Sequence, residues 1–268
     1  MSSSGPTISI VTVNLNNSCG LEKTIASVIS QNYSQIEYLL IDGGSTDESV
    51  AIIEKHSNHL TYKVSEPDNG VYAAMNKGVK KATKEYILFL NSGDVFYSGS
   101  SIQQLAGVSN GHDFIYGDLI VREGTHDWVK SYPSNLSFSY FLKDSLPHPC
   151  TLIKRSLFAS IGMYNEKLKI VSDWEFFVNA ICRYNATYKH IDQPIAIFSF
   201  HGLSSKSENQ ELLWHERDTI LKKGFGMFLT DYSHHQKVEE SLNLIMNSRF
   251  QKLINKMKNT AIYKAFKR

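Results

Sequence analysis

Four short polar clusters each follow a hydrophobic segment in the first hundred residues of this 268-residue chain. The clusters cover residues 14–17, 42–47, 66–70 and 91–94. Ligands of an open parallel sheet bind at the carboxyl ends of the strands, so we expect the four clusters to share one rim. Carboxylates that accept from an imide N–H or a ribose hydroxyl, and glycines that admit a flat base, are typical of a nucleotide pocket. The Asp-Gly-Gly-Ser segment is also ordinary turn chemistry, and that alternative stays open.

Two missing signatures narrow the kind of nucleotide site. No three-glycine dinucleotide fingerprint follows the first hydrophobic segment, and no Gly-x-x-x-x-Gly-Lys-Ser/Thr phosphate loop occurs in the chain. Hydride transfer and P-loop hydrolysis are therefore excluded. Asp94 remains as an acid placed to hold a divalent cation against a diphosphate. Mg²⁺ or Mn²⁺ suits such a site, because the substrate phosphates supply most of the oxygen ligands.

The hydrophobic pattern predicts the elements that hold these clusters in place. Apolar runs predict buried strands over residues 8–15, 36–41, 60–64 and 86–90. Apolar residues at helical spacing predict helices over 21–29, around Val50 and Ile53, and over 71–82. Asn17 or Ser18 can cap the first helix, and Ser45 with Glu48 has the form of a capping box for the second. The alternation predicts an α/β fold with a mostly parallel central sheet flanked by helices.

The pattern changes after about residue 100. Strands are expected over 114–121 and 194–198, and helices over 156–162 and 173–181, so this part is mixed. From about Leu212 the chain turns helical and polar, and residues 241–268 hold seven Lys or Arg and no Asp or Glu. Apolar residues interleave with these charges. The extension could lie on an anionic membrane surface, or it could be a solvated helix packed on the domain or on a partner.

Composition excludes several classes of protein. Charge is nearly balanced, with 28 Lys and Arg against 26 Asp and Glu, so we expect no nucleic-acid partner. The chain has no apolar run long enough for a transmembrane helix, and its first six residues resemble no secretory signal. We therefore expect a cytoplasmic protein. Cys19, Cys150 and Cys182 are odd in number and widely spaced, which indicates buried or idle thiols.

Five motifs, in order and spacing over about residues 7–205, resemble family two of the inverting glycosyltransferases with the GT-A fold. They are Ser9-Ile-Val-Thr-Val-Asn14, Leu39-Leu-Ile-Asp-Gly-Gly-Ser-Thr-Asp47, Asp68-Asn-Gly-Val-Tyr-Ala-Ala-Met-Asn-Lys-Gly78, Glu85-Tyr-Ile-Leu-Phe-Leu-Asn-Ser-Gly-Asp94 and Ser172-Asp-Trp-Glu-Phe176. The resemblance implies a GT-A-like domain over 1–210, with a nucleotide-binding half at about 7–100 and an acceptor half at about 100–205. A helical, basic C-terminal extension over 211–268 would follow it.

The resemblance also implies the donor site. Asp42 corresponds to the acid that reads the base or ribose, and Lys77 could offset phosphate charge. The residues expected to bind the nucleotide or donor are Asn14, Asp42, Gly43, Ser45, Asp47, Asn69, Gly70, Asn76, Lys77, Asn91 and Ser92. Asp94 matches the final acid of the family's metal motif. Asn91 and Gly93 stand where the family often has Asp, which puts metal dependence in doubt.

Asp173 matches the family's general base, and its alternative is a helix N-cap. His148 is expected on the acceptor side or as a structural histidine. Trp174 is expected as an apolar wall for a sugar ring or as a core residue. His201 resembles a loop residue that could complete the metal shell, although a lone loop histidine is usually only solvated.

The function implied is transfer of a hexosyl or N-acetylhexosaminyl group from a nucleotide-diphosphate donor, with a UDP-sugar favoured. The acceptor would be a hydroxyl of a glycan or of a lipid-linked oligosaccharide, in bacterial capsule or exopolysaccharide assembly at the inner face of the membrane. A sugar-nucleotide pyrophosphorylase is a rival, but its Gly-rich, Arg-containing signature is missing after the first strand. A non-catalytic nucleotide-sugar or carbohydrate binding protein with a degenerate metal motif is the other alternative.

Overall fold

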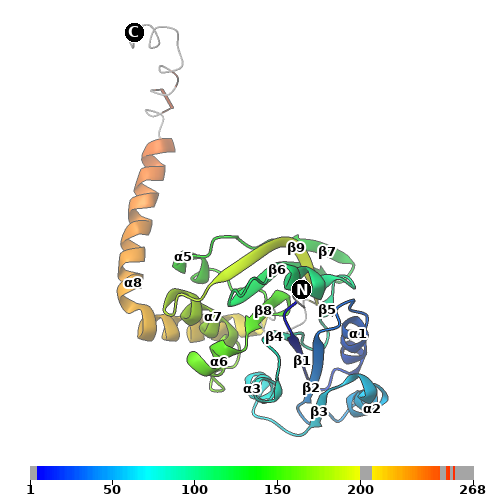
Figure 1. Ribbon diagram of the computed structural model, residues 1–268. Coiled ribbons are helices and arrows are strands. Elements are labelled where there is room, and N and C mark those ends of the chain that lie inside the picture. The colour runs from blue at the N-terminus through cyan, green and yellow to red at the C-terminus, as the bar shows by residue number, and fades with distance from the viewer. Residues whose placement is uncertain (1–4, 200–206, 248–251, 254–255, 257–268) are drawn as a thin grey trace. The chain divides into compact units, whose positions relative to one another are not determined.

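The computed structural model describes residues 5–199, 207–247, 252–253 and 256. Contacts divide the chain into two compact units, Met1–Glu216 and Arg217–Arg268. Figure 1 shows that the first unit contains the sheet and its flanking helices. The polar clusters and Asp173 all belong to this first unit, so it holds the candidate site.

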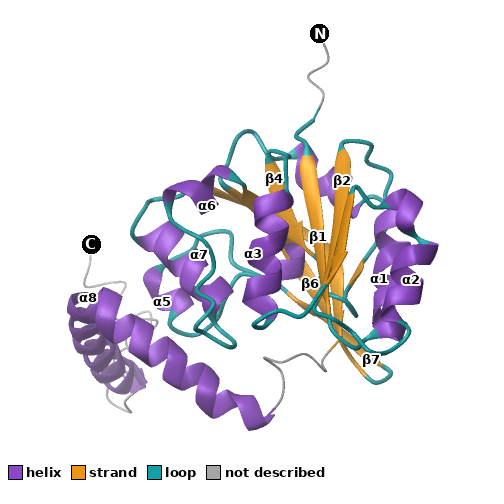
Figure 2. Cartoon of the chain, turned by 90° about the horizontal axis from the view of Figure 1, so that it is seen from below, coloured by secondary structure: helices purple, strands orange, loops and turns teal. Residues whose placement is uncertain are grey.

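The first half of the sheet has four parallel strands. They are β1 (Ile8–Asn14), β2 (Ile36–Asp42), β3 (Tyr62–Ser65) and β4 (Tyr86–Phe89), in the spatial order β3-β2-β1-β4. β1 and β4 are buried along their whole length, because helices cover both faces of a parallel sheet. Figure 2 shows α1 (Ser18–Ile29) and α2 (Ser49–Lys55) on one side of these strands and α3 (Val71–Lys81) on the other. The α/β fold and the first parallel strands are as predicted.

The register of these strands brings the predicted clusters together. Asn14, the last residue of β1, lies beside Asp42, the last residue of β2. Asp42 in turn lies beside Ser65, the last residue of β3. The three strands therefore end at one level, and the loops that follow them form a common rim.

The start of the first helix was predicted correctly, and the start of the second was not. The side chain of Asn17 caps α1 by accepting a hydrogen bond from Gly20 N at 3.2 Å. The capping box predicted at Ser45 and Glu48 is wrong, because Glu48 makes no side-chain cap bond and the Ser45 hydroxyl donates to Asp42. Val50, expected inside, is 39% exposed. The prediction failed because the Ser45 hydroxyl bonds to Asp42 at the rim and does not cap the helix.

The second half of the first unit is mixed, as predicted. Its strands are β5 (Val95–Phe96), β6 (Phe114–Glu123), β7 (His126–Lys130), β8 (Thr151–Lys154) and β9 (Tyr188–Ser199). The sheet continues from β4 in the order β8-β6-β9-β5, with β7 paired to β6. β8 runs antiparallel to β4 and β6, whereas β6 and β9 are parallel. The antiparallel β8 joins the parallel first half to the mixed second half.

Helices and short turns of helix complete this half. They are α4 (Ser101–Gly107), α5 (Phe138–Phe141), α6 (Ser156–Ser160), α7 (Ser172–Cys182) and the 3₁₀ turns η2 (His148–Cys150) and η4 (Ser207–Asn209). A further 3₁₀ turn, η1 (Ser57–His59), lies in the first half, between α2 and β3. α7 corresponds to the helix predicted over 173–181. Its first turn carries Asp173, so this helix sets the position of the candidate base.

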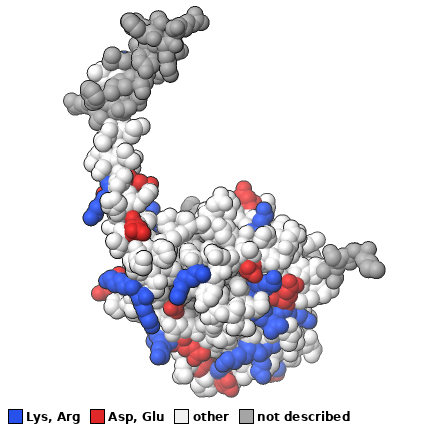
Figure 3. Space-filling view, turned by 60° about the vertical axis from the view of Figure 1, so that its left-hand side comes forward, with Lys and Arg blue, Asp and Glu red and all other residues white. Residues whose placement is uncertain are grey.

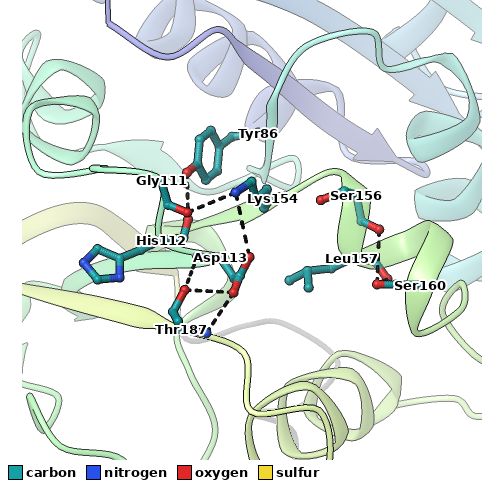
Figure 4. Close-up of polar contacts among 9 residues, drawn as sticks. All are labelled: Tyr86, Gly111, His112, Asp113, Lys154, Ser156, Leu157, Ser160 and Thr187. Carbon is teal, nitrogen blue, oxygen red and sulfur yellow. Dashed lines mark hydrogen bonds and ion pairs between the residues drawn. The ribbon is translucent and has the colours of Figure 1, made fainter.

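A group of hydrogen-bonded residues joins the strands at the end of the sheet opposite to the rim (Figure 4). Thr187 donates to Asp113 Oδ2 from its backbone N–H and its hydroxyl, at 2.9 and 2.8 Å. Lys154 Nζ donates to the carbonyl of Gly111 at 3.0 Å. Tyr86, at the start of β4, donates its hydroxyl to the carbonyl of His112 at 2.7 Å. These bonds tie together the beginnings of β4, β6 and β9 and the end of β8, far from the polar clusters.

Charged side chains on the surface are interspersed and often paired. On the face shown in Figure 3, Lys and Arg alternate with Asp and Glu over the first unit. Arg122 and Asp127, for example, form a two-bond pair at 2.8 and 2.6 Å on the β6–β7 hairpin. Exposed pairs of this kind contribute little to stability.

The helical extension is observed as α8 (Gln210–Asn247), which begins in the first unit and continues into the second. Its backbone leaves helical geometry at Phe225. Within the part of the chain that the structure describes, no helix is long and apolar enough to cross a membrane. The three cysteines are free thiols.

Candidate functional site

Asp42 lies at the centre of the rim and is fully buried. Its Oδ1 accepts from Asn14 Nδ2 at 2.7 Å and from the Ser45 hydroxyl at 2.6 Å. Its Oδ2 accepts from Gly44 N at 3.2 Å, Ser45 N at 2.9 Å and the Ser65 hydroxyl at 2.6 Å. Burial raises the pKa of Asp42, but the hydrogen bonds from Ser45, Ser65 and Asn14 outweigh it, so the net pKa is lowered. Asp42 is therefore an ionised group that shapes the loop after β2.

The glycines after Asp42 let two rim loops approach each other closely. Gly44 has a φ of +82°, and a Cβ there would lie 3.0 Å from Pro67 N. A Cβ on Gly43 would lie 3.1 Å from Asp68 Oδ2. The Asp68 carboxylate therefore faces the backbone of the loop after β2, and its Oδ1 accepts from Gly70 N at 3.0 Å. Asp68 was not among the predicted site residues, although it follows a strand as they do.

Asp47 and Asn16 connect the starts of two helices. Asp47 Oδ2 accepts from Ser18 N at 2.9 Å, and its Oδ1 accepts from Ser49 N at 3.0 Å. Asn16 has a φ of +50°, and its Oδ1 accepts from Thr46 N at 2.8 Å. These contacts give Asp47 a structural task at the rim, so its predicted contact with the donor stays a prediction.

The loop after β4 carries the candidate metal ligand. Asp94 is 7% exposed, and its backbone carbonyl accepts from the Thr24 hydroxyl at 2.7 Å. Asn17 Nδ2 donates to Ser92 O at 2.9 Å, so the first helix holds this loop from two sides. Asn91 Oδ1 is buried without a hydrogen-bond partner among the described residues. This orphaned oxygen is a hard ligand of the type that Mg²⁺ and Mn²⁺ take.

Asn14 also carries an unsatisfied oxygen. Its Oδ1 is buried without a partner among the residues the structure describes, while its Nδ2 is engaged by Asp42 and Ser45. Buried acceptors of this kind are costly unless a ligand or water supplies a donor. The end of β1 therefore has a buried, unsatisfied acceptor next to the rim.

Asp173 is partly buried in the first turn of α7. The N-cap of that helix is Val171, without a side-chain cap bond, so Asp173 is not its cap. The Tyr72 hydroxyl lies 2.8 Å from Asp173 Oδ1 and 2.6 Å from the carbonyl of Ile170, and its single proton can go to either. Burial and the Asp173 charge raise the pKa of Tyr72 well above its usual value, so Tyr72 is a neutral donor. Asp173 Oδ2 has no hydrogen-bond partner within the described ranges.

Asn76 holds the segment that leads to Asp173. Its Nδ2 donates to Tyr164 O at 2.9 Å and to Glu166 Oε1 at 2.8 Å, and its Oδ1 accepts from Tyr164 N at 3.0 Å. The side chain is 2% exposed. Little hydrogen-bonding capacity is left for a ligand, so direct donor contact by Asn76 stays a prediction. Lys77, by contrast, is partly exposed and pairs with Glu66 at 2.9 Å.

The two residues predicted on the acceptor side are both buried. His148 Nε2 lies 2.9 Å from the Tyr164 hydroxyl, and its ring packs 4.8 Å from that of Phe89. Burial lowers the pKa of His148 despite the opposing effect of the Asp173 charge. Trp174 is 1% exposed and donates Nε1–H to the carbonyl of Phe141 at 2.8 Å. Both positions match the core alternatives, and a contact with the acceptor stays a prediction. His201 lies outside the described residues.

The sequence does not single out Tyr72 or Thr24, and it predicts Asp68 only as a member of the rim cluster 66–70. Tyr72 was read as part of a helix with an apolar inner face, and nothing in its spacing indicates that its hydroxyl reaches a residue 101 positions further along the chain. Thr24 lies inside a helix, and only the fold brings it to Gly93 and Asp94. Asn69 and Gly70 are exposed at the start of α3, on the rim as predicted.

Comparisons with known proteins agree with this geometry. The family model described as "Glycosyl transferase family 2" matches residues 9–167. A PGL/p-HBAD biosynthesis glycosyltransferase of Mycobacterium bovis is 29% identical over 215 residues, covering 78% of this chain and 83% of the relative. The fold and these matches define a glycosyltransferase. The chain belongs to glycosyltransferase family 2.

Solved structures share the fold. S. aureus TarS 1–349 in complex with UDP-GlcNAc has a TM-score of 0.60 at 19% identity, covering 72% of this chain and 58% of that chain. The mannosyltransferase PcManGT from Pyrobaculum calidifontis, in complex with GDP-Man and Mn²⁺, has a TM-score of 0.58 at 14% identity, covering 73% and 57%. This chain thus spans less than two thirds of the solved chains that it matches. The expected GT-A-like fold is confirmed.

Proposed function

We propose that the protein transfers one sugar from a nucleotide-diphosphate donor, a UDP-sugar by preference, to an acceptor hydroxyl with inversion. The acceptor is a glycan or a lipid-linked oligosaccharide in surface polysaccharide assembly. The observation that carries the proposal is the carboxylate of Asp173, held at one oxygen by Tyr72 and without a hydrogen-bond partner among the described residues at the other. Inversion needs one such base, because the acceptor oxygen attacks the anomeric carbon while the diphosphate leaves from the opposite face.

Asp173 Oδ2 takes the acceptor proton as the new bond forms, while Tyr72 restrains the carboxylate. General base catalysis of this kind contributes roughly 10² to 10⁴ in rate. Lys77 stabilises the negative charge that develops on the leaving diphosphate once the donor competes for its contact with Glu66.

The donor base lies on the rim between the loops after β1, β2 and β3. Because Asp42 has five internal hydrogen bonds, we assign it the role of positioning this loop, with base contact left to the loop backbone and to Asp68. The TarS complex with UDP-GlcNAc supports a nucleotide-sugar donor for a chain of this fold. Uracil suits the site because its imide N–H can donate to a carboxylate or to an orphaned amide oxygen such as Asn14 Oδ1.

A divalent cation, Mn²⁺ or Mg²⁺, fits the loop after β4. The described residues hold no group of three His, Cys, Asp or Glu side chains suited to a metal. Asp94 and the orphaned Asn91 Oδ1 would hold the ion together with the donor diphosphate. When bound, the ion supplies positive charge against the leaving group. Support comes from the Mn²⁺ in the PcManGT complex.

The C-terminal unit contacts an anionic membrane surface in this proposal. Exposed apolar side chains occur along the described part of α8, including Met227 at 84% and Ile245 at 59%. Residues 241–268 add seven basic residues and no acidic residue. Sedimentation with anionic and with zwitterionic vesicles tests this contact. Removal of residues 241–268 should reduce binding to the anionic vesicles, and unchanged binding would refute the contact.

The test of the reaction pairs a binding assay with turnover. A thermal-shift panel of UDP, GDP, dTDP and CDP, with and without Mn²⁺, should give a metal-dependent shift with UDP. Asp173→Asn should keep that shift and lose donor hydrolysis and transfer by roughly 10² or more. Equal slow hydrolysis in both proteins would favour a non-catalytic binding protein instead. Asn91 and Gly93, at positions where the family often has Asp, support that alternative.

A further inference from the structure

A second feature of the first unit is a cavity of about 310 Å³ beside the candidate base. Its apolar walls are Val71 and Tyr72 of α3, Leu168 and Ile170 of the segment before α7, and Leu212 of α8. Asn69, Glu166, Lys169 and Asn209 add polar groups to the lining. An engineered apolar cavity of about 150 Å³ holds benzene, so this space accommodates one ring with a short apolar chain.

The cavity adjoins the reacting position through two of its walls. The Tyr72 hydroxyl contacts both Asp173 and Ile170, and Tyr72 and Ile170 each line the cavity. Asp173 itself does not line the cavity, but it is in direct contact with Tyr72, a residue of the cavity wall. Asn69 and Gly70, which lie on the rim, also line the cavity, so it borders the donor rim at the start of α3, whereas Asn14, Asp42 and Asp94 do not line it.

The wall of the cavity is fixed by a buried charge. Glu216 is 7% exposed, and its two oxygens accept from Lys169 N at 2.7 Å and Ile170 N at 3.1 Å. Hydrogen bonds to a charged group are among the stronger ones in proteins. The segment 168–170 is thus held in place, while Leu212 remains 39% exposed at the cavity. Apolar surface that stays exposed in a fixed site favours an apolar occupant.

We infer that this cavity binds an apolar aglycone, so that the acceptor is an amphiphile whose sugar hydroxyl meets Asp173 while its ring or chain lies against Leu168, Ile170 and Leu212. The inference rests on the proposed function, and it specifies the acceptor class that the function leaves open. A purely carbohydrate acceptor would leave these apolar walls exposed to water.

The test compares two sets of probes on the full chain in the presence of UDP. Phenyl glycosides and methyl glycosides of glucose, galactose and mannose are titrated by ligand-observed NMR, so that each pair differs only in the aglycone. Burial of much of a phenyl ring predicts about tenfold tighter binding of the phenyl members. Leu212→Ser should reduce this preference to below about threefold. Leu244→Ser is the matched control, because Leu244 belongs to the same helix and is 75% exposed.

A second variant distinguishes loss of the cavity from misfolding of Leu212→Ser. Leu212→Trp fills the cavity and should likewise abolish the preference, while UDP affinity stays unchanged in every variant. Equal binding of phenyl and methyl glycosides by the unaltered chain would overturn the inference, as would a preference that survives both substitutions. Failure of UDP to bind, with the phenyl preference intact, would refute the proposed function and leave the cavity assignment standing.

Discussion

Tyr72→Phe is the sharpest test of how the base is held. The substitution removes one hydroxyl from a side chain that is 6% exposed and changes no other atom. That hydroxyl lies 2.6 Å from Ile170 O and 2.8 Å from Asp173 Oδ1. The variant therefore releases the carboxylate and the segment before α7 without opening a large cavity.

The expected magnitude follows from the partner's charge. A hydrogen bond to a charged group contributes about 1.5 to 3 kcal/mol, and we take the lower end because Asp173 is only partly buried. If the transition state loses about 1.5 kcal/mol of stabilisation when this bond is removed, kcat falls about tenfold, because about 1.4 kcal/mol corresponds to a factor of ten in rate. The donor KM should not change, because Tyr72 does not line the nucleotide rim.

Tyr86→Phe provides the control. Tyr86 is fully buried and also donates its hydroxyl to a backbone carbonyl, but at the end of the sheet opposite to the rim. Both variants should lose about 1 kcal/mol or more in urea unfolding, and only Tyr72→Phe should lose kcat for transfer. If Tyr72→Phe keeps kcat within twofold of the unaltered enzyme, Tyr72 does not position the base and the reasoning fails.

Three other expectations concern the rim and the core. Asp42→Asn should reduce the free energy of unfolding by about 3 kcal/mol, because an amide cannot accept all five hydrogen bonds; a loss under 1 kcal/mol in urea would contradict the loop-positioning role. The lowered pKa of His148 means that the unfolded chain binds a proton below about pH 6.5 that the folded chain does not. Stability in urea unfolding should therefore fall from pH 7 to pH 5, and it should fall less steeply in His148→Gln. Asn91→Asp should lower the melting temperature in EDTA and enlarge the Mn²⁺-dependent stabilisation by about 1 kcal/mol; an unchanged Mn²⁺ effect would remove Asn91 from the metal site.

The sequence predicts the elements whose burial is complete. β4 is a continuous apolar run and β1 is rich in β-branched residues, and both are buried throughout. Met75 and Val79 of α3 and Ala82 at its end are buried as the spacing predicts, whereas Val71 is only half-buried. β5 has two residues, and the residues of β7 are exposed except for its last, which is half-buried, so neither leaves a hydrophobic signal. Hydrophobic periodicity thus indicates which residues are buried, and it does not detect a strand that pairs with a neighbouring strand but stays exposed.

The site was predictable at the level of residue type and strand position, but not of hydrogen bonding. Asp42 and Asp94 look alike in the sequence, since each acid follows a buried strand. In the folded protein Asp42 accepts five hydrogen bonds, from the last residues of β1 and β3 and from the loop after β2, a condition that depends on the register of three strands. The Tyr72–Asp173 contact joins residues 101 positions apart, and no local pattern encodes it.

The contacts of Glu216 bear on where this chain can be divided. A cut after residue 210, where the helical and polar extension begins, would remove the acceptor of two backbone N–H groups, those of Lys169 and of the buried Ile170. Loss of activity in such a fragment would then report damage beside the base and not the absence of the extension. A deletion or an exchange of C-terminal extensions between relatives should therefore retain the first turns of α8 through Glu216.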